Sequence, residues 1–154
     1  MLAPLEGESF YVFEEKAEMR YNRLRHAACA VDMITDKFIV VTGSMKKDSE
    51  NKAEKYNLTT NTWTTLPDLR NGRMDHGMSA MGSTVYVFCG KMNPVNNDII
   101  ESLDLSDPSA TWQMIGIPDG QEKLRRAFSV SAINNHEIAI VGGGQSSGAN
   151  NTEE

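Results

Sequence analysis

A pattern of about fifty residues occurs twice in full along this chain and a third time in part. In each full copy a histidine, His26 or His76, precedes an apolar run that ends in a glycine, Gly43 or Gly90. A glutamate, a tryptophan and then a Leu-Pro or Ile-Pro pair follow in the same order. Self-similarity at a fixed period of roughly 20–50 residues is the sequence signature of repeat architectures, so this feature constrains the fold first.

The repeat divides the chain into five parts. A third copy begins near Arg126 and reaches Gly142-Gly143, while Glu8-Ser9-Phe10 resembles Glu54-Lys55-Tyr56 of the first full copy. We therefore expect residues 1–22 to be the end of a preceding unit or a lead-in. Residues 23–72 and 73–122 are the full repeats, and residues 123–144 are the first half of another. Residues 145–154 are polar and predict a disordered tail.

Each full repeat predicts four short strands separated by turn residues. The second strand is apolar on both faces, which indicates a sheet covered on both sides. No segment shows sustained helical spacing of apolar residues, so the predicted fold class is all-β. The expected strands are Ala27–Val31 and Gly77–Met81, then Phe38–Thr42, Val85–Cys89 and Ile138–Val141, then Ala53–Asn57 and Ile99–Asp104, and last Thr62–Thr65 and Thr111–Ile115.

These marks together resemble the kelch repeat. The resemblance covers residues 23–144 and implies four-stranded antiparallel blades packed around a central channel. The second copy departs from the family pattern by having Leu103 where an aromatic residue is expected. The residues that carry the resemblance are Gly43, Glu54, Tyr56, Trp63, Gly90, Glu101, Trp112, Gly142 and Gly143.

The number of repeats predicts an incomplete ring of about three blades per chain. Propellers have roughly 4–8 blades, and an open ring exposes apolar faces and unpaired strand edges. Three arrangements stay open: a slice of a longer propeller, a homodimer that completes a six-bladed ring, or a subunit covered by other chains of a complex.

Composition limits the partners and the compartment. The formal net charge of −6 argues against non-specific binding to nucleic acid or to an anionic membrane. No apolar run approaches the roughly 20 residues of a membrane span, and the first residues do not resemble a signal peptide. Cys29 and Cys89 lie in apolar runs, which predicts reduced core thiols. We expect a cytoplasmic location, with association with the cytoskeleton as a further possibility.

Nothing in the sequence indicates catalysis, so we expect no enzyme activity, cofactor or metal. Gly142 and Gly144 begin a glycine-rich stretch that lacks the third glycine, the helix and the acidic residue of a dinucleotide-binding motif. His26 and His76 take the same place in successive repeats, which predicts structural roles. His136 falls in a predicted turn.

Basic residues precede each first strand, and two explanations for them stay open. They could form a basic rim at the channel mouth that binds an acidic partner peptide. They could instead serve solubility and donate hydrogen bonds to carbonyls between the blades. On the first explanation, charge reversal at Arg23 and Arg25 weakens partner binding without unfolding the chain. The candidate partner-binding residues are Arg20, Arg23, Arg25, Arg73, Arg125 and Arg126.

The expected function is a non-catalytic protein-interaction or scaffolding module, because propeller loops present variable surfaces on a rigid frame. One alternative is a structural subunit of a large complex, cytoskeletal or ciliary in kind. The other is a kelch-type propeller enzyme, for which copper chemistry would need Tyr, His and Cys ligands that converge. The sequence does not bring Tyr56, His76 and Cys89 together in this way.

Overall fold

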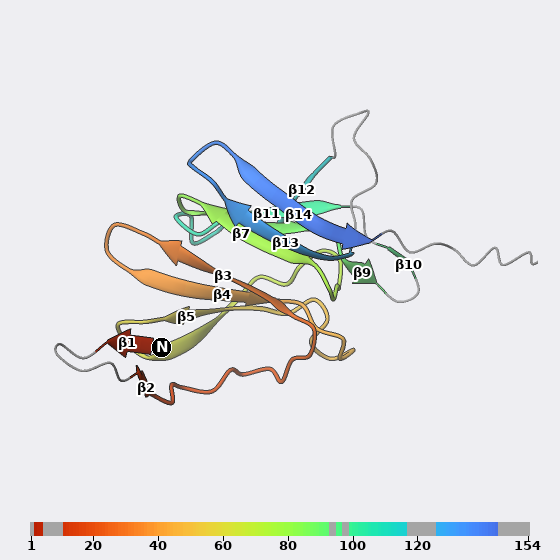
Figure 1. The fold of residues 1–154 in the computed structure, drawn as a ribbon. Helices are drawn as coiled ribbons and strands as arrows, with labels where there is room; N and C mark the ends of the chain where they lie inside the picture. The colour runs from red at the N-terminus through yellow and green to blue at the C-terminus, as the bar shows by residue number, and fades with distance from the viewer. Residues whose placement is uncertain (1, 5–10, 93–94, 97–98, 117–125, 145–154) are drawn as a thin grey trace, which may run out of the picture.

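The computed structural model describes residues 2–4, 11–92, 95–96, 99–116 and 126–144 (Figure 1). Every regular element among them is a β-strand, and every strand pairing is antiparallel. The all-β prediction is therefore confirmed. The predicted tail, residues 145–154, lies outside the described residues.

The first unit is a four-stranded sheet of β3 (Ala27–Asp32), β4 (Lys37–Thr42), β5 (Ala53–Asn57) and β6 (Thr62–Leu66) in that spatial order. Turn chemistry closes the hairpins, since the Asn57 side-chain oxygen accepts hydrogen bonds from two backbone N–H groups beyond β5. The order of pairing along the chain is that of an up-and-down meander.

The second unit repeats the first with β7 (Gly77–Met81), β8 (Thr84–Phe88), β11 (Ile100–Asp104) and β12 (Gln113–Ile115). A small hairpin, which the sequence did not predict, lies between its second and third strands. It consists of β9 (Lys91–Met92) and β10 (Val95–Asn96).

Two pairs of strands stand beside these sheets. β13 (Arg126–Ala132) pairs with β14 (Ile138–Gly144), and we call this pair the third unit. β1 (Leu2–Pro4) pairs with β2 (Tyr11–Phe13) near the N-terminus. Glu8-Ser9-Phe10, whose resemblance to the third strand suggested a preceding unit, lies outside the described residues. The described sheets do not close into a ring.

The first strands of successive units lie side by side, β3 against β7 and β7 against β13 (Figure 1). Backbone hydrogen bonds join the residues that enter these strands: Asp75 N donates to Arg25 O over 3.1 Å, and Ala127 N donates to Asp75 O over 3.0 Å. All three residues have positive φ, between 53° and 58°. The same positive-φ conformation thus recurs where the chain enters the first strand of each unit. The hydrogen bonds at these positions link the three units in series.

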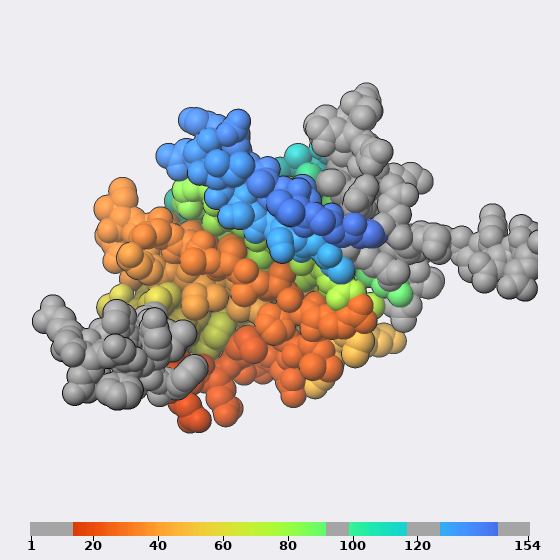
Figure 2. All heavy atoms as spheres, viewed as in Figure 1, coloured from red at the N-terminus to blue at the C-terminus, as the bar shows by residue number. Residues whose placement is uncertain are grey.

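The apolar core lies between the first and second units. Phe38 and Val40 of β4 pack in one cluster with Val85, Val87 and Trp112 of the second unit. Phe38 and Val40 alternate along β4, as Val85 and Val87 do along β8, so one face of each second strand packs in the core between the two sheets. In the space-filling view the third unit, in blue, lies against the second at the surface (Figure 2).

The repeated tryptophans take equivalent positions with unequal burial. Trp112 Nε1 donates to Pro67 O over 2.8 Å, and the residue is 1% exposed. Trp63 Nε1 donates to Ala17 O over 2.7 Å but stays partly exposed. The carbonyl of Ala17 therefore accepts from Trp63 as the carbonyl of Pro67 accepts from Trp112. Trp112 is the more buried of the two and belongs to the core cluster between the first and second units.

His76 is buried where the first and second units meet. Its Nε2 lies 2.8 Å from Thr42 Oγ1, and its Nδ1 has no hydrogen-bond partner among the described residues. Gly43 and Gly90, both with positive φ, approach His76 so closely that a Cβ at either position would collide with it. The two glycines of the repeat therefore make room for this histidine.

Stability should fall with acid because of His76. Burial lowers its pKa to about 3, and the positive charges of Arg73, His26 and Arg23 add to the shift. Between its ordinary value of 6.5 and about 3, the unfolded chain binds a proton that the folded chain excludes, so stability is lost as pH falls. The contribution is at most about 1.4 kcal/mol per pH unit in that window.

Urea unfolding of the natural chain and of His76→Gln at pH 7 and pH 5 measures this loss. We expect the natural chain to lose more free energy of unfolding than the variant over the same interval. An equal loss in both proteins would assign the acid sensitivity to other groups.

Candidate protein-interaction surface

A buried ion pair fixes the entrance to the first unit. The guanidinium of Arg23 bonds Glu54 Oε2 through Nη2 over 2.9 Å and through Nε over 3.3 Å. Its Nη1 donates to Gly43 O over 3.0 Å and to Lys52 O over 2.8 Å. Both charged side chains are 0% exposed. We call this pair, with the carbonyls it holds, the first clasp.

The second unit repeats this arrangement with Arg73 and Glu101. Arg73 Nη2 bonds Glu101 Oε1, and Nη1 donates to Cys89 O and Ile99 O, each over 3.0 Å. Both side chains are again 0% exposed. Burial lowers the pKa of Arg73, while the charge and hydrogen bond of Glu101 oppose that shift. We call this pair, with the carbonyls it holds, the second clasp. The buried ion pair therefore recurs at the same place in both full repeats.

Each clasp glutamate also holds the chain segment that enters its unit. Glu54 Oε1 accepts from Arg20 N over 2.9 Å. Glu101 accepts from Arg70 N over 2.8 Å and from Asn71 N over 3.2 Å. A carboxylate that is hydrogen-bonded on both oxygens and paired with Arg satisfies the conditions for burying a charge. The clasps therefore join the third strand, the second-strand carbonyl and the entering segment.

These contacts correct the sequence-based prediction for Arg23 and Arg73. Neither guanidinium lies on a rim where a partner could reach it, because both side chains are fully buried. The explanation by hydrogen bonds to carbonyls fits both: Arg23 donates to carbonyls of its own unit, and Arg73 donates to two of its own unit and to Asn71 O before it. Charge reversal at Arg23 would place a carboxylate against Glu54, so we expect this substitution to destabilise the chain.

The other candidate residues have different places. Arg25 is 47% exposed at its side chain and pairs with Asp75, whose hydrogen bond and charge raise the pKa of Arg25. Arg20 is exposed. Arg126 begins β13, and Arg125 lies outside the described residues. Of the four arginines whose side chains the structure describes, Arg20 and Arg25 lie at the surface, whereas Arg23 and Arg73 are buried.

An exposed apolar pair accompanies Arg25. Leu24 and Met45 are each 48% exposed, and Met45 N donates to Leu24 O over 2.8 Å. Arg25 Nη1 lies 3.9 Å from Met45 Sδ. We call Leu24, Arg25 and Met45 the rim patch, because it lies where the chain enters β3, the first strand of the first unit. Its mixture of aliphatic area, thioether and guanidinium is typical of protein-recognition surfaces.

Sequence reasoning did not find the clasps, although their signal was present. An arginine precedes each first strand, and a glutamate stands in each third strand at the same place in the repeat. The glutamates were assigned to the structural motif, and the arginines either to a basic rim or to hydrogen bonds with carbonyls, so the two halves of each ion pair were not connected. Only the pairing of β4 with β5 and of β8 with β11 brings them together.

The described residues contain no group of three His, Cys, Asp or Glu side chains placed to hold a metal ion. Burial raises the pKa of the Cys29 thiol to about 12, and neither Cys29 nor Cys89 is in a disulfide. Burial, with a smaller effect of Arg23, lowers the pKa of His26. His136 lies exposed in the turn before β14.

No helix of the described part of the chain is both long and apolar enough to cross a membrane.

Comparison with known families adds one match. Residues 23–70 match the family model of the Kelch motif. No curated protein matches the chain significantly. Residues 23–70 span the first clasp and all four strands of the first unit. The all-β architecture with four-stranded antiparallel sheets fits part of a kelch-repeat β-propeller.

Removing one partner of a clasp should destabilise the chain strongly. Glu54→Gln keeps the shape of the side chain but leaves the Arg23 charge buried without its counter-ion, which costs about 3–5 kcal/mol. Urea unfolding followed by tryptophan fluorescence measures the loss. Glu101→Gln should act in the same way in the second unit.

The matched control is Asp75→Asn, which removes the partner of the partly exposed Arg25. We expect a cost below about 1 kcal/mol there, as for other exposed pairs. Similar costs for Glu54→Gln and Asp75→Asn would contradict the structural role of the clasp.

Proposed function

We propose that this kelch-repeat chain is a non-catalytic protein-interaction and scaffolding module. The kelch motif in residues 23–70 supports protein interaction in general. The rim patch supports it in particular, because aliphatic and thioether groups beside an arginine are exposed at one end of a frame fixed by two clasps. A rigid frame that presents loop residues is suited to recognition.

The proposal includes a cytoplasmic location and a protein partner. The absence of a disulfide at Cys29 and Cys89 supports a reducing compartment. The net charge of −6 supports a protein rather than a nucleic-acid or membrane partner. No feature of the described residues favours the enzyme alternative.

Substitutions in the rim patch test the proposal. Leu24→Asp with Met45→Asp should reduce the partners captured from lysate, because the apolar contact area is replaced by charge. Both side chains are exposed, so the free energy of unfolding should change by less than about 0.5 kcal/mol per site.

The control is Ile34→Asp, which changes a fully exposed residue in the turn at the opposite end of β3. It should leave the captured partners unchanged. Capture that is identical for the rim variant and the natural chain, with both proteins folded, would count against the rim patch as the interaction surface.

A second candidate function, that of a subunit within a larger ring, is favoured by the outer edge of the third unit. Among the described residues β14 pairs only with β13, and its Ile140 and Val141 are 38% and 66% exposed. The partial exposure of Trp63 also supports it, since its counterpart Trp112 is covered by the neighbouring unit. A second copy that completes a six-bladed ring, or other chains of a cytoskeletal or ciliary complex, would cover these surfaces.

Light scattering during size-exclusion chromatography measures the mass of the purified chain and tests this candidate. We expect twice the 17.0 kDa chain mass if a second copy completes the ring. Val141→Lys should shift the mass to that of one chain. A stable monomer, both purified and in lysate, would overturn the ring-subunit candidate and leave the interaction-module proposal standing.

A further inference from the structure

The three units can be aligned through their first strands. Hydrogen bonds in series join Arg25, Asp75 and Ala127, which enter these strands with similar positive φ. In each first strand the residue three positions later pairs with a residue of the second strand, so the alignment extends to the second strands. The equivalent residues of β4, β8 and β14 are Val41, Val87 and Ile140.

In the first and second units this aligned position faces the clasp glutamate. Glu54 of β5 pairs with Val41, and Glu101 of β11 pairs with Val87. Both valines are buried, whereas Ile140 is exposed. Among the residues that the structure describes, no strand pairs with the outer edge of β14. The position opposite Ile140 is therefore where a third clasp glutamate would stand.

The strand β14 also carries the carbonyl position of a clasp. The arginines of the first and second clasps donate to Gly43 O and Cys89 O, each two residues beyond the aligned valine. The same step beyond Ile140 leads to Gly142, and all three residues have positive φ, between 50° and 79°. The second strand of the third unit thus ends in the backbone conformation that the two clasps use.

The arginine of a third clasp is present in the sequence. Arg23 and Arg73 each stand two residues before the aligned residue that enters the first strand. Arg125 stands at the same distance before Ala127. Arg125 lies outside the described residues, and its sequence position alone assigns it here. The third unit therefore repeats the elements of a clasp that precede the third strand.

The sequence also supplies a glutamate at the required distance. Glu153 lies as many residues beyond Gly142 as Glu54 lies beyond Gly43. That length of chain is enough to leave one strand and return antiparallel beside it, because the connection between β4 and β5 does so. A segment that begins near Thr152 can therefore reach the outer edge of β14.

The residue before the glutamate favours Glu153 over its neighbour Glu154. The clasp glutamates follow Ala53 in β5 and Ile100 in β11, both apolar, and Ala53 belongs to the core between the units. With Glu153 in the clasp, the uncharged Thr152 takes this place. With Glu154 in the clasp, the charge of Glu153 would take it, at a cost in desolvation.

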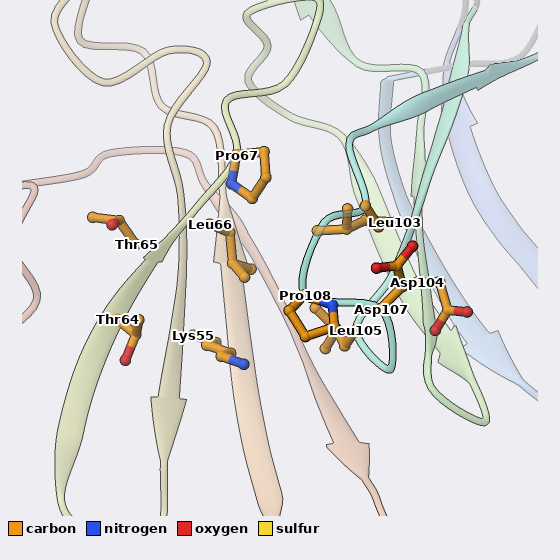
Figure 3. Close-up of a pocket in the computed structure, with 11 residues that line it drawn as sticks. Lys55, Thr64, Thr65, Leu66, Pro67, Leu103, Asp104, Leu105, Asp107 and Pro108 are labelled. Carbon is orange, nitrogen blue, oxygen red and sulfur yellow. The ribbon is translucent and has the colours of Figure 1, made fainter.

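The residue after the glutamate agrees with this choice. Lys55 and Ser102 follow the two clasp glutamates, and both are polar and partly exposed. Figure 3 shows Lys55 on β5 at the groove between the first and second units, which Leu66 and Leu103 also line. Because this position stays in contact with water, the equivalent place in the third unit accommodates the charge of Glu154.

We propose that Glu153 and Arg125 form a third clasp at the outer edge of β14. Residues 152–154 add to that edge as an antiparallel strand with Glu153 opposite Ile140. The guanidinium of Arg125 donates to the Glu153 carboxylate and to Gly142 O. Charge-assisted hydrogen bonds of this kind hold the strand in one register, as they do in the first and second clasps.

This inference goes beyond the proposed function and does not depend on it. It gives the edge of β14 to the chain's own residues, in place of the disordered tail that the composition of residues 145–154 predicts. The side chains of Ile140 and Val141 lie on the two faces of the strand and not at its edge, so they stay available to the ring-subunit candidate.

Amide hydrogen exchange measured by NMR on the full chain tests the third clasp. Successive N–H groups of a strand point to opposite neighbours, and Gly43 N donates to Lys52 O just before β5. By the alignment, the N–H of Ile140 points to the added strand and that of Val141 points to β13. We therefore expect the Ile140 amide to be protected from exchange in the natural chain.

Glu153→Gln and Arg125→Gln should each speed the exchange of the Ile140 amide about tenfold. The variant with both substitutions should exchange no faster than either, because the two residues act as one pair. Exchange of the Val141 amide should stay unchanged, which would show that the third unit remains folded. Glu154→Gln is the matched control one residue away and should change the exchange of the Ile140 amide by less than about twofold.

An Ile140 amide that exchanges at the unprotected rate in the natural chain would overturn the third clasp. Additive effects of the two substitutions, or an equal effect of Glu154→Gln, would overturn it as well. Protection that increases with protein concentration would assign the added strand to a second copy and count against the chain's own residues. None of these outcomes changes partner capture through the rim patch, so a failure here leaves the proposed function standing.

Discussion

The buried pairing of Arg23 with Glu54, and of Arg73 with Glu101, is the interaction on which the other features depend. Each arginine lies just before the first strand of its unit. Its guanidinium donates to one carbonyl at the end of the second strand and to another just before the third strand. Each glutamate returns hydrogen bonds to the entering backbone. One fully satisfied ion pair thus determines how a meander of short strands begins and how it follows the preceding segment.

Buried ion pairs are weak sources of net stability, because desolvation offsets most of their attraction, but losing one partner is costly. That asymmetry suits a repeat protein, in which each unit must join its neighbour in one register. The apolar core between the units stabilises them without a preferred geometry. The clasps add ion pairs and hydrogen bonds, which do have a preferred geometry. Because the clasps fix the frame, the exposed residues Leu24 and Met45 can be substituted without disturbing it.

Much of the fold could be predicted from the sequence. Strands β5 and β7 have the predicted limits, and most others differ by one or two residues because turn residues bound them. The hairpin of β9 and β10 was missed, since two-residue strands leave no periodic pattern. The sequence left a basic rim and hydrogen bonds to carbonyls open for Arg23 and Arg73, because it gives the residue type but not the carbonyls around the side chain. Trp63 and Trp112 look alike in sequence and differ in burial.

The sequence by itself determined the repeat, the all-β class and the positions of glycines that only a residue without a side chain can fill. These are local properties, set by periodicity and backbone sterics within each unit. The tertiary structure decided which charges are buried and which tryptophan is covered. Those depend on contacts between residues far apart in the chain, which strand pairing and the packing of one unit against the next create.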